Sequence, residues 1–170
     1  MKTELIAQRR QLLKKRFISS MIQLYAVLAV TAYNCVAEIV LPGFVLPVSF
    51  YIPQFIASYA KFLSKSGESR ALFSLLVILS FVLVLFIAFC LIFARRNYKL
   101  LKFINVLASV DIVMLIYFGI STLFTTGWQP FFVINIFLHI WILFTSATAC
   151  RASEGLEVLP ESDEESDSDD

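Results

Sequence analysis

Four blocks of nearly uninterrupted apolar residues dominate the chain, and short polar segments separate them. The blocks cover about residues 17–41, 71–94, 100–124 and 131–150. A helix of about 20 apolar residues, rising about 1.5 Å per residue, crosses a hydrocarbon layer about 30 Å thick. The pattern therefore predicts an all-α integral membrane protein, whose residues 17–150 form a compact antiparallel bundle of four transmembrane helices.

The polar segment between the first two blocks has a periodicity of its own. It contains the prolines Pro42, Pro47 and Pro53, which prevent one continuous helix. From Gln54 to Lys65, apolar and polar side chains then fall on opposite faces of a helix. This pattern predicts an amphipathic interfacial helix in the first outer loop. A re-entrant segment is the alternative, and it requires that protein shields the backbone.

The two terminal segments carry opposite charge. Residues 1–16 read as a basic amphipathic segment, which either binds anionic headgroups at a membrane surface or anchors the topology. Residues 151–170 contain seven acidic residues after position 160, and this composition predicts a disordered acidic tail. The tail either increases solubility or docks on a basic partner, the amino-terminal segment included.

Composition and charge agree with the hydrophobic pattern. Of 170 residues, 59% are hydrophobic and 16% are charged, with a mean hydropathy of +0.80, whereas soluble domains average about 45–50% and about 25%. With both ends cytoplasmic, 11 of the 14 Lys and Arg residues lie on the cytoplasmic side. The positive-inside rule therefore predicts this orientation for a multi-pass protein of the cell membrane.

One acidic residue falls in the middle of a block. Asp111 lies near the centre of the third block, where an ionised carboxylate costs about 2.5–3.5 kcal/mol. We therefore expect it to face the bundle interior. A hairpin register centred on Thr126 and Gly127 places His139 within about 4.5 Å of the same depth, which makes it the predicted partner.

Other polar residues extend along two helix faces. Asn135, His139 and Ser146 share a face of the fourth block, and Thr31, Asn34 and Glu38 share one of the first. Glu38 is either exposed to water at the membrane interface or the outer gate of a polar path. The second block adds nothing polar to such a path and is expected to be a lipid-facing wall. These residues either fix helix packing, recognise a partner's helix or conduct protons or ions.

The sequence lacks the residue patterns of metal sites and nucleotide-binding enzymes, and this limits the classes of function to consider. There is one histidine, and the three cysteines have no metal-site spacing. No glycine-rich phosphate loop occurs. We therefore expect no catalytic residues, no metal, no cofactor and no nucleic acid.

The expected function is a non-enzymatic partner, assembly or regulatory subunit of a larger membrane complex, in contact with the lipid bilayer and a membrane-protein partner. The alternative is a small oligomeric proton- or cation-linked transporter or channel that uses Asp111 and His139, for which the partner is a second copy of the chain.

Overall fold

The computed structural model describes residues 2–41, 45–67, 70–94, 97–126 and 130–159, and within these ranges the regular structure is entirely α-helical. The helices are α1 (Lys2–Val40), α2 (Tyr51–Lys65), α3 (Arg70–Phe93), α4 (Lys99–Thr126) and α5 (Pro130–Val158). All except α2 contain a segment long and apolar enough to cross a membrane. The prediction of an all-α chain with four such helices is therefore confirmed, and α2 is the fifth helix.

Two boundaries differ from the sequence prediction. The basic segment 1–16 is not a separate helix, since α1 runs unbroken from Lys2 to Val40. At the other end, α5 continues to Val158, so that the first eight residues of the predicted tail are helical. Residues 160–170, which hold most of the acidic side chains, lie outside the described residues.

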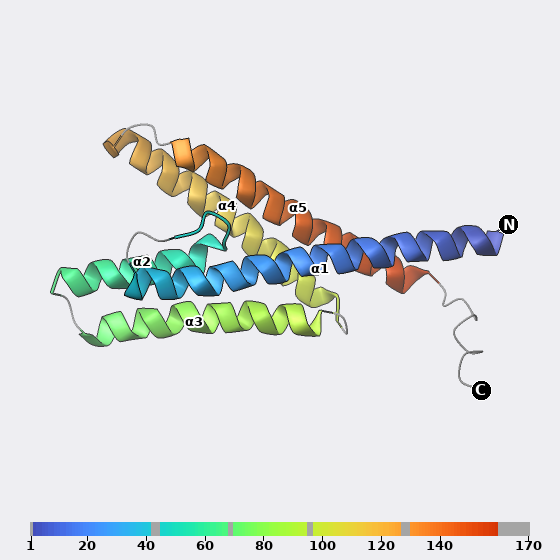
Figure 1. The fold of residues 1–170 in the computed structure, drawn as a ribbon, viewed down its shortest axis with the longest axis horizontal. Coiled ribbons are helices and arrows are strands. Elements are labelled where there is room, and N and C mark those ends of the chain that lie inside the picture. The colour runs from blue at the N-terminus through green and yellow to red at the C-terminus, as the bar shows by residue number, and fades with distance from the viewer. Residues whose placement is uncertain (1, 42–44, 68–69, 95–96, 127–129, 160–170) are drawn as a thin grey trace.

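The helices pack as two pairs that α1 joins (Figure 1). α2 lies beside α3, α4 lies beside α5, and α1 packs against α2, α3 and α5. The amino-terminal part of α1 and the end of α5 extend past the end of α3 (Figure 1). At this level Leu13 of α1 lies so close to α5 that a Cβ at Gly155 would be 2.9 Å from its Cδ1 atom.

The apolar core lies where α1, α3, α4 and α5 meet. Its largest buried side chains are Phe50, Met21, Leu24, Ile87, Leu91, Leu101, Ile104 and Ile142. The same helices carry large apolar side chains on their outer faces, such as Leu85 (68% exposed) and Phe144 (68% exposed). An apolar outer face of this kind suits contact with lipid rather than water.

Candidate functional site

The candidate site is built around the amino end of α2. After α1 ends, the chain returns along α1, because the side chain of Asn34 holds the backbone of Leu46. Asn34 donates from Nδ2 to the Leu46 carbonyl (2.7 Å) and accepts from the Leu46 N–H at Oδ1 (2.9 Å). One turn deeper, the Phe50 N–H donates to Oγ1 of Thr31 (2.9 Å). Thr31 lies about 14 Å from the end of α1, so α2 begins well inside the protein.

Every free N–H group at the start of α2 has an acceptor on another helix. The first N–H groups of an α-helix lack partners within the helix, and here Phe50 supplies no side-chain cap. The Phe50 N–H binds Thr31, and the N–H groups of Tyr51 and Ile52 bind Asp111. The next residue, Pro53, has no N–H. Side chains of α1 and α4 therefore satisfy the helix end completely.

Asp111 supplies both of its carboxyl oxygens to this helix end. Oδ2 accepts from the Tyr51 N–H at 2.8 Å and Oδ1 from the Ile52 N–H at 3.0 Å. The residue is 1% exposed, so it faces the interior as predicted. Its partner is the backbone of α2, and not His139. A carboxylate at this position also interacts favourably with the dipole of α2.

A second layer of polar contacts surrounds the same helix end. Gln54 Oε1 accepts from the Ser49 hydroxyl (2.6 Å) and from Asn34 Nδ2 (3.3 Å). From α3, the Ser80 hydroxyl donates to the Pro53 carbonyl (2.8 Å). The expectation that the second block adds nothing polar is therefore wrong, since Ser80 is fully buried in this layer. The opposite side of α3 is exposed.

His139 and Asn135 lie beside this site without joining its hydrogen bonds. His139 Nδ1 is 2.8 Å from the Asn135 carbonyl, which can only accept, so Nδ1 carries a proton. Nε2 and the Asn135 Oδ1 are both buried without a hydrogen-bond partner. The Ser49 backbone also faces the ring. The ring is edge-on to Tyr51, with 6.4 Å between centroids.

The remaining members of the two predicted faces lie elsewhere. The Glu38 carbonyl accepts from the Lys61 ammonium, which caps the carboxyl end of α1. Ser146 donates to Asn105 Oδ1 (2.9 Å) and so joins α5 to α4. The structure therefore brings Thr31, Asn34 and Asp111 together around the start of α2, whereas Glu38 and Ser146 do not belong to that group.

The residues of α2 were the part of the site that sequence reasoning missed. Their contribution is made by backbone N–H groups, which no residue type reveals. One signal was present, because no Ser, Thr, Asp or Asn directly precedes Tyr51 and a helix start without a cap needs an outside acceptor.

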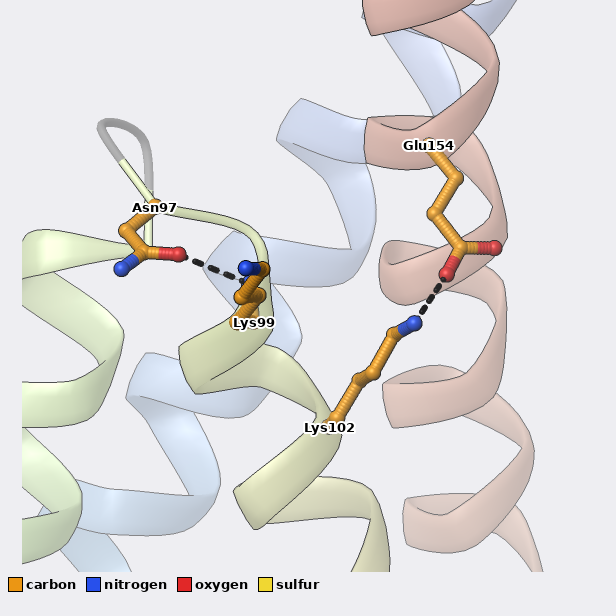
Figure 2. A network of polar contacts seen from close by, with 4 residues as sticks. All are labelled: Asn97, Lys99, Lys102 and Glu154. Atoms are coloured by element: carbon orange, nitrogen blue, oxygen red, sulfur yellow. Dashed lines mark hydrogen bonds and ion pairs between the residues drawn. The ribbon is translucent and has the colours of Figure 1, made fainter.

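A separate set of polar contacts joins the other ends of α4 and α5 (Figure 2). Lys102 Nζ is 2.8 Å from Glu154 Oε1, and the two side chains are 55% and 42% exposed. Where α4 begins, the Lys99 N–H donates to the Asn97 Oδ1 at 3.1 Å, an Asx-type turn that ends the connection from α3. The ion pair joins the extension of α5 to α4 at an exposed position.

Neither a group of metal-binding side chains nor a similar known protein indicates what the site does. In the part of the chain that the structure describes, no three His, Cys, Asp or Glu side chains are grouped to hold a metal ion. Comparison with models of known protein families, with curated protein sequences and with solved structures found no match. The function must therefore be argued from the arrangement of the chain itself.

Proposed function

We propose that the chain crosses a membrane four times, through α1, α3, α4 and α5, with both ends cytoplasmic and with α2 as a re-entrant helix. The length and hydropathy of the four helices and the distribution of Lys and Arg support this topology. The re-entrant position of α2, which replaces the interfacial one, is supported by the hydrogen bonds at its start. Backbone at bilayer depth must be satisfied by protein, and the N–H groups of Phe50, Tyr51 and Ile52 meet that requirement.

We propose that the protein is a non-enzymatic partner, assembly or regulatory subunit of a larger membrane complex. The observation that supports this most is the extension of α1 beyond α3 (Figure 1). On it, Leu5 and Leu12 are 69% and 59% exposed. They are seven residues apart and therefore share a face. Exposed leucines at this spacing, among the basic residues Arg9 and Arg16, suit an amphipathic helix of a partner protein.

The hydrogen bonds of the polar site favour the subunit function over the transporter function. Both Asp111 oxygens are bound to backbone N–H groups, and Thr31 and Asn34 are also occupied by backbone. Side chains that are used to hold a helix end are not free to bind an ion in transit. The buried polar residues therefore fix the fold, and contact with a partner is assigned to the surface of α1.

Co-purification from native membranes in mild detergent tests the proposal. The wild-type chain is expected to retain a stoichiometric membrane-protein partner, identified by mass spectrometry. The double variant Leu5→Gln/Leu12→Gln should lose it. A matched variant, Gln8→Ala/Gln11→Ala, changes exposed polar positions of the same segment and should keep it. A wild-type chain that is isolated alone, or a partner that survives the leucine substitutions, contradicts the proposal.

A second function is favoured by one observation. His139 Nε2 and Asn135 Oδ1 are buried without a hydrogen-bond partner, on residues one helical turn apart, and a proton at Nε2 or a cation at either atom would satisfy that atom. A small oligomeric proton- or cation-linked transporter would therefore use His139, with Asp111 only positioning α2. Ion flux into proteoliposomes that is abolished by His139→Gln would support this function. Absence of flux, or a strict monomer in lipid, would exclude it.

A further inference from the structure

An apolar groove separates α3 from α4. Its volume is about 220 Å³. The first turn of α2 closes one part of it, and side chains of α3 and α4 form the walls. Residues that line it include Pro53, Leu83, Cys90, Phe103, Val106 and Val110. No charged side chain is among the lining residues, so nothing in the walls replaces the hydrogen bonds of water, and a dry, apolar occupant is favoured.

The groove is too small to enclose a helix. An α-helix with its side chains is at least about 10 Å across, so about 220 Å³ holds about half a turn of one. The groove is also open to the outer face of the protein, since Phe103 is 61% exposed and Val106 is 60% exposed. A thin, extended hydrocarbon chain that enters from the bilayer fits both the size and the opening.

A positive charge lies at one end of the groove. Lys99, Phe103, Val106 and Val110 are spaced four, three and four residues apart, so they share one face of α4. Lys99 is exposed and lies one turn beyond Phe103 at the start of α4. In the proposed topology this end faces the cytoplasmic headgroups, where a lysine attracts anionic lipid. The groove therefore offers an apolar channel with a cation at its headgroup end.

We propose that this groove is a binding site for one acyl chain of an anionic phospholipid of the cytoplasmic leaflet, with its phosphate paired with Lys99. The site rests on the four membrane crossings of the proposed function, and not on the partner. The lipid covers the gap between α3 and α4 and contacts Ile52 and Pro53 at the start of α2. Lipid at this site therefore contacts the start of the re-entrant helix directly.

Native mass spectrometry of the full chain, released from nanodiscs, tests the site. The nanodiscs contain equal amounts of phosphatidylglycerol and phosphatidylcholine with matched chains. Val106→Trp fills the groove, and Val110→Trp provides a second filling variant. Val113→Trp is the matched control, because Val113 is a 65% exposed residue of α4 that does not line the groove. Lys99→Gln removes the charge alone.

The wild type is expected to keep one phospholipid per chain after the other lipids are stripped. Phosphatidylglycerol should be preferred about fivefold, since one lysine near anionic lipid contributes about 1 kcal/mol. Both filling variants should lose the lipid, and the control should keep it. Lys99→Gln should keep a lipid with the preference abolished. A wild type without retained lipid overturns the proposal, as does equal loss in the control or an unchanged preference in Lys99→Gln.

The result also separates this site from the proposed subunit function. A retained lipid together with no protein partner would contradict the subunit function and leave the lipid site intact. A partner that co-purifies with a lipid-free chain would support the subunit function and contradict the lipid site. A stable dimer whose interface is broken by Val106→Trp, with no lipid in the wild type, would assign the groove to a second copy and overturn the proposal.

Discussion

Asp111 accepts a hydrogen bond from the N–H of Tyr51 at 2.8 Å, across 60 positions of the chain. The bond joins the middle of α4 to the first residue of α2, a helix that has no cap of its own. A buried N–H that loses its acceptor costs the free energy of leaving water without compensation. The position of α2 in the protein therefore depends on α4, and the consequences can be measured.

Replacing Asp111 by Asn should loosen the start of α2. The amide keeps one oxygen acceptor, but its NH2 group faces a backbone N–H in place of the second. We expect a loss of about 1–3 kcal/mol in the free energy of unfolding. Hydrogen exchange at the amides of Tyr51 and Ile52, measured by mass spectrometry in nanodiscs, should become faster. The exchange of amides in the middle of α3 should change less.

Ser109→Ala is the control for this substitution. Ser109 is also on α4, but its exposed hydroxyl donates only to the carbonyl of Asn105 in the same helix (2.9 Å). Its removal should leave the exchange of α2 unchanged. If Asp111→Asn left Tyr51 and Ile52 as protected as in the wild type, the hydrogen bonds from Asp111 would not hold the helix end.

Thr31→Val should also loosen the start of α2, because Thr31 binds the Phe50 N–H. Valine keeps the shape of threonine but removes the Oγ1 that accepts from the Phe50 N–H, so we expect a loss of about 1–2 kcal/mol. Thr31→Ser keeps the acceptor and should lose less. Because Thr31 and Asp111 hold neighbouring N–H groups, the double variant should cost less than the sum of the single ones. Strictly additive unfolding free energies would indicate independent sites.

The four long helices could be predicted from the sequence because each depends on a block of local hydrophobicity. The position of α2 stayed open between an interfacial and a re-entrant helix, because it depends on single hydrogen bonds between residues far apart in the chain. Thr31, Asn34 and Asp111 were identified as inward-facing polar residues, since lipid makes them costly elsewhere. What they bind is the backbone of residues 46–52, and backbone groups have no signature in the sequence.

The sequence did not reveal the partner of Asp111, which was predicted to be His139. The hairpin register placed both residues at similar depth, and both do lie beside Tyr51. Depth alone does not choose between two acceptors, however. The amide donors at the start of α2 reach Asp111, and the imidazole turns its Nδ1 to Asn135 in its own helix. The pairing was wrong because backbone N–H groups at the start of α2, and not His139, occupy both carboxyl oxygens of Asp111.

Gly119→Ala should disturb the contact between α4 and α5. The ring of Phe132 occupies the place where a Cβ at position 119 would lie. Alanine therefore forces the ring to move, and overpacking of this kind costs about 1–3 kcal/mol. Thermal unfolding in detergent should show a lower Tm. The second substitution Phe132→Leu, which removes the far part of the ring, should recover most of the loss, and failure to do so would place the strain elsewhere.

Lys102→Gln should have little effect on stability, although it removes a well-formed ion pair. Both Lys102 and Glu154 are exposed, and exposed pairs contribute about 0–1 kcal/mol because solvent screens them. We expect the Tm to fall slightly at low salt and to match the wild type at high salt. A large loss that persists at high salt would mean that the extension of α5 depends on this pair.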